Sequence, residues 1–456
     1  MNMNELLKSQ AAGLPEDILK RKWAGDFAGA IAAIDARLQR DIPELLKNRL
    51  LVERELIARL PAQYPYTKKE AVAAIQKQVP DFTEAEFDKM SLDGGVDFIY
   101  VQGEPRYFES VVSGALFWDK GLNARAGKHD SYDRPILDQA IADLKKEGSL
   151  GYRLTFKVEY HIDDKAFVPG ETYRVHLPVP KPSAQQSNID IAPQLGGIIA
   201  PESAHARTVF YERTLDKNEP FIVEYAYDSR VHYIDVHGRP DIVTPLYHGV
   251  PEPTADDLKE QWPHIAFTPY LVELAKELRG AVKDDILVAR AIYDYVTKNV
   301  TYSFLRDYAL IGDMAEYMAL GLRGDCGAQA VLFITLCRLN GIPARWQSGT
   351  VAREDATGPH DWAQFYVEPY GWLFADPSFG GSAWRGGHTA RWNFYFGNLD
   401  PFRMVANDMY MAPLLHEPDA LRMDPYDNQS GECEVGGRTL QTEERTVKRT
   451  LKVEKL

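Results

Sequence analysis

The segment at residues 321–345, GLRGDCGAQAVLFITLCRLNGIPAR, constrains the fold more than any other part of the chain. Its apolar run at 330–337 is too short to cross a bilayer, which takes roughly 18 apolar residues. The run therefore predicts a helix buried in a protein core. We expect this helix to begin near Cys326 and to end at about Asn340, because Gly341 suits the left-handed conformation that follows many helices.

The spacing of apolar residues changes along the chain and divides it into regions. Residues 1–150 have a mainly helical period, and the Thr67/Glu70 and Thr83/Glu86 pairs each fit a capping box. A short hairpin is predicted around Gly103. Residues 1–150 are therefore expected to form a mainly helical N-terminal domain.

The rest of the chain favours sheets and mixed structure. Residues 151–260 contain short segments that alternate apolar and polar side chains, which is typical of a small antiparallel β-sandwich. Residues 261–430 combine the helical and the strand period. Residues 431–456 are predicted to form a terminal strand or tail. These patterns predict an α+β protein in which a mixed core follows the sandwich.

Cys326 stands where a reactive thiol would be expected. The first turn of a helix has backbone N–H groups without partners and carries the positive end of the helix dipole. Both features stabilise a thiolate, so we expect a lowered pKa for this thiol. The backbone N–H of Cys326 could also donate to an oxyanion, and Gly324 and Gly327 would let a substrate carbonyl approach closely.

His360 and Asp376 bracket a predicted hairpin, HDWAQFYVEPYGWLFADPS. A turn at 369–371 folds the second strand back along the first, so the two side chains should become neighbours. A nominal register leaves them about three residues from direct opposition, a difference that a bulge or strand twist would have to remove. An aspartate at this place would orient the imidazole and support its protonated form.

The ordered set of motifs is similar to the core of the transglutaminase-like superfamily, a relative of the papain-like cysteine peptidases. GDCG at the helix start, GIPAR, the HDW strand and the ADPS strand follow one another over about residues 285–400. The resemblance implies a papain-like fold for the mixed core. It also implies that Cys326 is the nucleophile, His360 the general base and acid, and Asp376 the residue that orients His360.

Several residues near the triad are further candidates. Tyr302, Gln329 and Trp362 are each a possible second oxyanion donor or substrate contact, with Tyr302 suggested by its position before the helix. Asp361 stands where the family often has a small residue, and its carboxylate is expected to raise the pKa of His360.

The remaining motifs favour structural roles. Cys337 is expected to be a core residue, Cys433 to be incidental, and Arg345 to form a structural ion pair. The segment HYIDVHGRPD offers His232, Asp235 and His237, but an odd spacing would place the two histidines on opposite faces of a strand. No metal site and no cofactor are therefore expected.

Composition narrows the function classes. The formal net charge is −14, which disfavours binding to nucleic acid or anionic membranes because phosphates would be repelled. The first residues lack the apolar stretch of a secretion signal, so a cytoplasmic location is the expectation.

The sequence thus predicts a cysteine-dependent enzyme that transfers acyl groups from peptide or amide bonds through a thioester, with hydrolysis of a peptide or protein substrate favoured. A protein-glutamine transglutaminase is the first alternative, since an amine can replace water. A catalytically silent scaffold that binds through the sandwich and an acetyl-CoA-dependent acyltransferase remain open.

Overall fold

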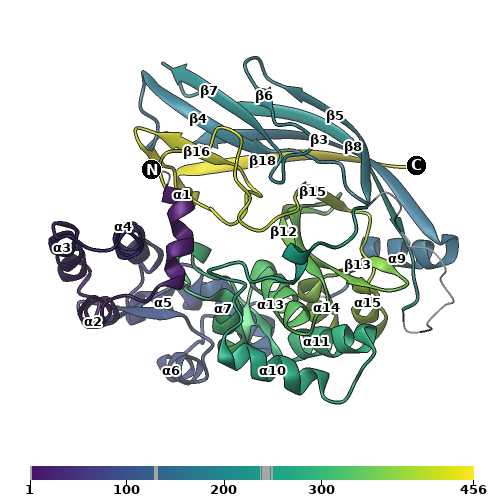
Figure 1. The fold of residues 1–456 in the computed structure, drawn as a ribbon, viewed down its shortest axis with the longest axis horizontal. Helices are drawn as coiled ribbons and strands as arrows, with labels where there is room; N and C mark the ends of the chain where they lie inside the picture. Colours follow the sequence, from purple (N-terminus) through teal and green to yellow (C-terminus); the bar gives the residue numbers. More distant parts are fainter. Residues whose placement is uncertain (1–2, 128–131, 237, 239–246, 248–249) are drawn as a thin grey trace.

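The computed structural model describes residues 3–127, 132–236, 238, 247 and 250–456. Figure 1 shows a β-sandwich lying across a mixed core of helices and strands, with the N-terminal helices to one side. The α+β class predicted from the sequence is confirmed. No helix in these described ranges is long and apolar enough to cross a bilayer.

The N-terminal region consists of short helices and one hairpin. Its elements are α1 (Met3–Leu6), α2 (Glu16–Trp23), α3 (Phe27–Leu38), α4 (Glu44–Arg59), α5 (Lys68–Gln76), α6 (Glu84–Leu92), β1 (Phe98–Val101), β2 (Glu104–Tyr107), α7 (Val111–Trp118), α8 (Lys120–Arg125) and α9 (Pro135–Glu147). Both predicted capping boxes are present, at Thr67 and Thr83. The predicted hairpin is also confirmed, and Gly103 takes its left-handed position at φ 81°.

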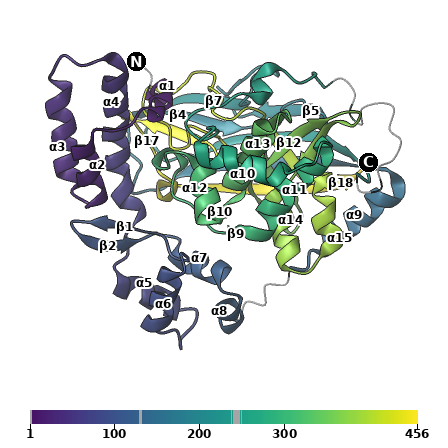
Figure 2. The same ribbon diagram turned by 60° about the horizontal axis from the view of Figure 1, so that its bottom comes forward.

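These helices pack in two groups. Side chains of α1 to α4 join the large hydrophobic cluster that also contains the core helices. By contrast, α5 to α8 and β2 share a smaller cluster of their own. Figure 2 shows α5, α6 and α8 together at one corner of the molecule. Helix α7 links this corner to the core, because Phe117 contacts the ring of Tyr302 with a centroid distance of 5.0 Å.

The sandwich consists of two antiparallel sheets. One has the strand order β18-β3-β8-β5 and the other β17-β16-β4-β7-β6. The strands are β3 (Ser149–Ile162), β4 (Glu171–Pro178), β5 (Gln186–Pro193), β6 (Ile198–Ile199), β7 (Thr208–Leu215), β8 (Phe221–His232), β16 (Glu432–Val435), β17 (Arg438–Thr439) and β18 (Arg445–Lys455). Three of them come from the end of the chain, and Figure 1 shows β18, in yellow, beside the blue strands of the same sheet.

The mixed core is built around α13. Its helices are α10 (Pro269–Arg279), α11 (Asp285–Asn299), α12 (Met314–Gly321), α13 (Cys326–Leu339), α14 (Pro377–Arg385) and α15 (Thr389–Phe394). Its strands are β9 (Thr301–Tyr302), β10 (Arg323–Gly324), β11 (Ala344–Arg353), β12 (Ala356–Val367), β13 (Gly371–Ala375), β14 (Phe396–Gly397) and β15 (Arg403–Asn407). The main sheet has the order β14-β13-β12-β11-β15.

Helix α13 matches the sequence-based prediction at both ends. It starts at Cys326, and Gly341 follows its end with φ 74°. Its residues from Gly327 to Arg338 are all buried, as an apolar run requires. The sheet covers the helix mainly through β12 and β11, so the thiol at the helix start lies next to the strand that carries His360.

Candidate active site

The start of α13 is held by a side-chain cap. Asp325 accepts a hydrogen bond from the backbone N–H of Ala328 at 3.1 Å and another from the Tyr308 hydroxyl at 2.7 Å. Residue 327 has to be glycine, because a Cβ there would come within 2.1 Å of the Tyr308 hydroxyl oxygen. Cys326 is thereby fixed on a rigid helix terminus, and it is partly exposed.

His360 and Asp376 are hydrogen-bonded, as the hairpin predicted. The last cross-strand pair of β12 and β13 is Ala363–Ala375, and Asp376 follows directly as the N-cap of α14. From there its Oδ2 lies 2.8 Å from His360 Nε2. Both side chains are buried, so the contact is shielded from water.

A buried arginine that the sequence analysis missed completes this pair. Arg403, on β15, donates from Nη2 to Oδ2 of Asp376 at 2.9 Å and to Asp400 at 2.6 Å. It is 1% exposed. No sequence motif marks Arg403, because it lies in the aromatic-rich segment after the hairpin. It meets Asp376 only because β15 folds back into the same sheet. Arg403 supplies a fixed positive charge behind the carboxylate.

The electrostatics of the pair favour a neutral imidazole and an ionised carboxylate. Burial lowers the pKa of His360, and Asp376 opposes this effect. Burial acts to raise the pKa of Asp376, but the charges of His360 and Arg403 bring it below its usual value. A neutral imidazole beside a carboxylate is suited to accept a proton.

The thiol itself does not have the lowered pKa that its helix position predicted. Burial raises the pKa of Cys326, and the carboxylates of Asp361 and Asp325 raise it further. Sγ donates to Oδ2 of Asp361 at 3.4 Å. The resting group is therefore a protonated thiol, since burial together with two nearby acidic side chains outweighs the helix terminus.

Asp361 also differs from the expectation that it would raise the pKa of His360. The pKa of His360 is lowered, and the charges that act on it are those of Asp376, Arg403 and Asp400. Asp361 instead accepts from Nε2 of Gln429 and contacts the thiol. Burial and the neighbouring Asp427 carboxyl raise the pKa of Asp361. Adjacent residues of a strand point to opposite faces, which separates His360 from Asp361.

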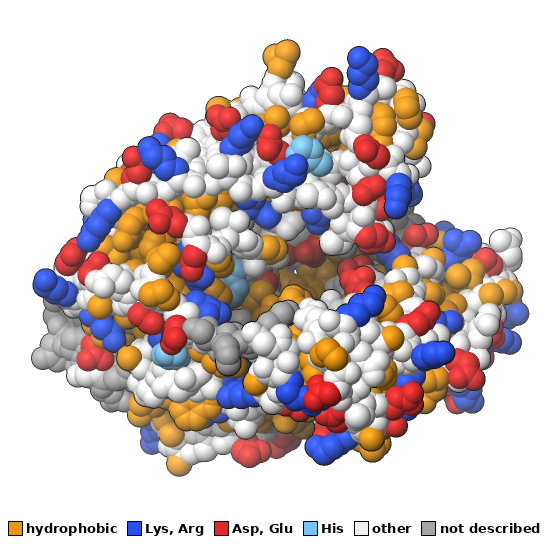
Figure 3. All heavy atoms as spheres, turned by 180° about the vertical axis from the view of Figure 1, so that it is seen from behind, with side chains coloured by type: hydrophobic (Ala, Val, Ile, Leu, Met, Phe, Trp, Pro, Cys, Tyr) orange, Lys and Arg blue, Asp and Glu red, His pale blue; other side chains and the backbone are white. Residues whose placement is uncertain are grey.

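Cys326 and His360 open onto the same cleft, which has a volume of about 360 Å³. Tyr302 and Phe117 line it as well, so the N-terminal region contributes to its wall. The charged lining residues are four arginines and no carboxylate: Arg134, Arg353, Arg385 and Arg391. Positive and negative side chains are otherwise interspersed over the face of the molecule in Figure 3.

Of the three candidate oxyanion donors, the structure places only Tyr302 in the wall of the cleft. Burial raises the pKa of its phenol, and the charge of Cys326 adds to that effect, so the hydroxyl is a donor. Gln329 uses its amide N–H on the carbonyl of Gly324 at 3.0 Å. Trp362 donates its indole N–H to Gln347 at 2.8 Å. Both groups are occupied in packing beside the site.

The other residues singled out from the sequence lie away from the triad. Cys337 is buried in the core, as predicted, and Cys433 is buried in the sandwich. Arg345 does not form the expected ion pair within the described ranges; its Nε donates to Gln364 at 2.7 Å. His237 lies outside the described residues. Among the residues described, no group of three acidic, histidine or cysteine side chains is arranged to hold a metal ion.

Comparisons with known proteins find similarity to part of the chain. Residues 272–377 match the Transglut_core family, the transglutaminase-like superfamily. No curated protein matches the chain. A solved structure of a putative cysteine protease from Cytophaga hutchinsonii is similar over 68% of this chain and 91% of its own, with 16% identity and a TM-score of 0.43. The periplasmic domain of TgpA from Pseudomonas aeruginosa is similar over 55% and 94%, with 16% identity and a TM-score of 0.29.

The matched residues run from α10 to the start of α14 and therefore include Cys326, His360 and Asp376. Within this α+β chain, residues 272–377 are the part that matches the transglutaminase-like superfamily.

Proposed function

We propose that the protein is a cysteine-dependent enzyme that hydrolyses peptide or amide bonds through a thioester. The observation that carries the proposal is the buried hydrogen bond between His360 Nε2 and Asp376 Oδ2, in a histidine that shares one cleft with Cys326. Because Asp376 occupies Nε2, the other ring nitrogen is left to exchange a proton with the thiol and the substrate.

In the proposed reaction, His360 accepts the proton of the Cys326 thiol as Sγ attacks the substrate carbonyl. The oxyanion of the tetrahedral intermediate accepts from the backbone N–H of Cys326 and from the Tyr302 hydroxyl. The C–N bond then breaks, and His360 returns the proton to the departing amine. Water attacks the resulting thioester with His360 again as base, which releases the acid and restores the thiol.

The cleft favours a substrate with negative charge near the bond that is cut. Four arginines and no carboxylate line it, in a chain whose formal net charge is −14. Two of them are also paired with carboxylates that lie outside the cleft wall, Arg353 with Asp355 and Arg391 with Asp138. Opposite charge attracts a substrate and orients it, whereas a lysine or arginine side chain would be repelled. We therefore infer that acidic peptides are better substrates than basic ones.

The test is incubation of the wild type and Cys326→Ala with a library of peptides that vary in charge, in the presence and absence of a primary amine, followed by mass spectrometry. Hydrolysis splits a peptide with the addition of water, deamidation replaces an amide by an acid, and amine transfer joins two masses with loss of ammonia. The matched control is Cys433→Ala, which removes a buried cysteine in the sandwich.

The expected result is hydrolysis by the wild type and by Cys433→Ala, and none by Cys326→Ala. If the main product joins the amine to the peptide, the protein is a protein-glutamine transglutaminase and the proposal of hydrolysis is wrong. If the wild type and Cys326→Ala formed equal amounts of all three kinds of product, the thiol would have no catalytic role.

A further inference from the structure

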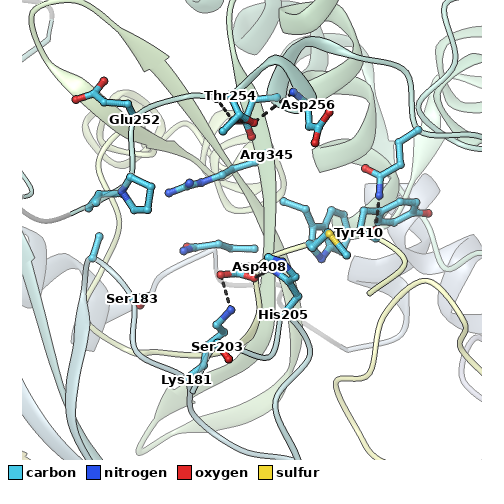
Figure 4. Close-up of a pocket in the computed structure, with 18 of the residues that line it drawn as sticks. Lys181, Ser183, Ser203, His205, Glu252, Thr254, Asp256, Arg345, Asp408 and Tyr410 are labelled. Atoms are coloured by element: carbon cyan, nitrogen blue, oxygen red, sulfur yellow. Dashed lines mark hydrogen bonds and ion pairs between the residues drawn. The ribbon is translucent and has the colours of Figure 1, made fainter. Parts of the chain in front are cut away.

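Two cavities of the molecule differ in the side chains that line them. One, of about 800 Å³, holds charged groups that pair with one another, such as Asp408 with Lys181 and His205 (Figure 4). Arg345 also lies in its wall. The catalytic cleft shares no lining residue with this cavity and presents aromatic rings beside Cys326. Most of these rings have no role in the proposed reaction.

Three aromatic side chains of the cleft wall contact one another: Phe117, Tyr302 and Phe304. The ring centre of Phe117 lies 5.0 Å from that of Tyr302 and 5.9 Å from that of Phe304. The ring centres of Tyr302 and Phe304 are 5.7 Å apart. At such distances aromatic rings attract one another, so the three side chains form one surface. We call it the Phe117 cluster.

Strands β9 and β10 hold the Phe117 cluster next to the thiol. Tyr302 pairs with Gly324, two residues before Cys326, and the N–H of Ser303 donates to the carbonyl of Gly324 at 3.2 Å. The cluster is therefore fixed beside the start of α13. A substrate whose carbonyl meets Cys326 would lie against it.

Two rings of the cluster are only half-buried. Phe117 is 43% exposed and Phe304 is 40% exposed. The neighbouring apolar residues of α7, by contrast, are buried in the hydrophobic core of the N-terminal corner: Val111, Ala115 and Leu116. Phe117 is thus turned away from the core of its own region and towards the cleft. Exposed aromatic surface of this kind is stabilised when an apolar group covers it.

Phe117 reaches the cleft from outside residues 272–377, the part that matches the transglutaminase-like superfamily. The N-terminal region holds it in place, because α7 packs on β9 and Lys120 of α8 donates to the carbonyl of Arg385 at 2.8 Å. The N-terminal region therefore supplies a side chain to the cleft that the matched core does not itself contain.

We propose that the Phe117 cluster is a subsite for an aromatic side chain of the substrate, close to the bond that is cut, and that Phe117 determines this specificity. The subsite rests on the proposed function, because it narrows the substrate class of the same cleft. An aromatic ring can lie against two half-exposed rings in the tilted arrangements that such rings prefer, and it loses little conformational freedom on binding. A small aliphatic side chain would cover less of the exposed surface.

The test measures alkylation of the Cys326 thiol, which does not require turnover. The two reagents are N-(2-phenylethyl)iodoacetamide and N-ethyliodoacetamide. With both, Sγ forms a bond to the methylene carbon, iodide leaves, and the thiol proton passes to the buffer. Because the reactive group is the same, the ratio of the two second-order rate constants, measured by mass spectrometry, reports contact of the phenyl ring with the protein. We expect a ratio on the order of 10 in the wild type.

Substitutions locate this contact. Phe117→Ala should bring the ratio close to 1, Phe304→Ala should reduce it, and Phe117→Trp, which keeps an aromatic ring, should retain it. The matched control Phe98→Ala removes a phenylalanine of similar exposure, 38%, which lies on β1 outside the cleft, and should leave the ratio unchanged. Because the ratio is taken within each variant, a general change in thiol reactivity cancels. A ratio close to 1 in the wild type, or one that survives Phe117→Ala, would overturn the proposal.

Peptide hydrolysis separates this subsite from the proposed function. If the phenylethyl reagent is preferred but no peptide is cut, the subsite stands and the proposal of hydrolysis is wrong. If peptides with Phe and with Ala beside the bond are cut equally well and the alkylation ratio is close to 1, hydrolysis stands and the subsite is wrong. Circular dichroism confirms that each variant is folded, and Phe304→Ala, which lies outside α7, decides the question if Phe117→Ala disturbs that helix.

Discussion

The residue next to His360 acts on the state of the Cys326 thiol. His360 and Asp361 follow one another on β12, and Asp361 accepts a hydrogen bond from the Cys326 sulfur at 3.4 Å. The resting site is therefore a neutral thiol held by an acidic side chain rather than a preformed thiolate. In the proposed reaction, this thiol becomes a nucleophile only when His360 takes its proton.

Replacing Asp361 with asparagine should make the thiol more acidic, because it removes a negative charge next to the sulfur. The midpoint of iodoacetamide labelling at Cys326 against pH is expected to move down by about one pH unit or more. The control is Asp355→Asn, which removes a carboxylate paired with Arg353 instead. An unchanged midpoint in Asp361→Asn would show that this carboxyl group does not act on the thiol.

Replacing Asp376 with asparagine should lower kcat/KM on an acidic peptide by about 10³-fold or more, because the imidazole loses its orienting carboxylate. Asp400→Asn is the matched control. Both aspartates accept from Arg403, but only Asp376 contacts His360. Peptide turnover of both variants, with circular dichroism to confirm folding, checks this prediction. Equal losses would mean that Arg403, rather than the His360 contact, accounts for the effect.

At the scale of single elements, the C-terminal strand closes the sandwich. Strand β18 pairs with β3 along its whole length, from Arg445–Ile162 to Lys455–Tyr152. Val447, Leu451 and Val453 pack against the sandwich core. The other residues of the strand are polar or charged, which is why the sequence indicated only a terminal strand or tail.

Deleting residues 445–456 should expose the edge of β3 and the side chains beneath β18. An unpaired strand edge promotes association between molecules, so we expect a lower unfolding temperature and aggregation, measured by light scattering. The control is deletion of Leu456 alone, which leaves β18 intact. A truncated protein that stays monomeric with an unchanged unfolding temperature would contradict this role.

At the scale of the whole molecule, His264 joins distant segments in one buried contact. Its Nε2 lies 3.0 Å from the carbonyl of Ile311, and its Nδ1 contacts the hydroxyl of Tyr410. Its ring centre lies 4.1 Å from that of Tyr426, with the two rings tilted by 31°. Burial lowers the pKa of His264 to about 3. The native protein therefore holds this histidine neutral.

This histidine should make the protein less stable as the pH falls. The unfolded chain binds a proton below about pH 6.5, whereas the native chain does not until about pH 3, so acidification favours unfolding over that window. Relative to His264→Gln, the wild type should lose about 2 kcal/mol of unfolding free energy between pH 6.5 and pH 5. Buried carboxyl groups such as Asp313, whose pKa burial raises to about 7, change stability in the opposite direction in both proteins.

Urea unfolding of both proteins at the two pH values measures this difference. An identical pH dependence in the wild type and His264→Gln would show that His264 is not held neutral.

Much of the architecture could be predicted because it depends on local pattern. The apolar run of α13, its start at Cys326, the two capping boxes and the hairpin after Tyr100 are each encoded by neighbouring residues. The contact of His360 with Asp376 also followed from sequence, since a tight hairpin fixes which strand ends meet.

The sequence by itself therefore determined the elements and the order of Cys326, His360 and Asp376. Only the tertiary structure decided the charge around them: Arg403 behind Asp376, Asp361 against the thiol, and a raised thiol pKa in place of a lowered one. The tertiary structure also placed Arg345 in the wall of a pocket, where it donates to Gln364 in place of the expected ion pair. The physical reason is that burial and charge depend on side chains brought together from far along the chain, and no local pattern records which of them will meet.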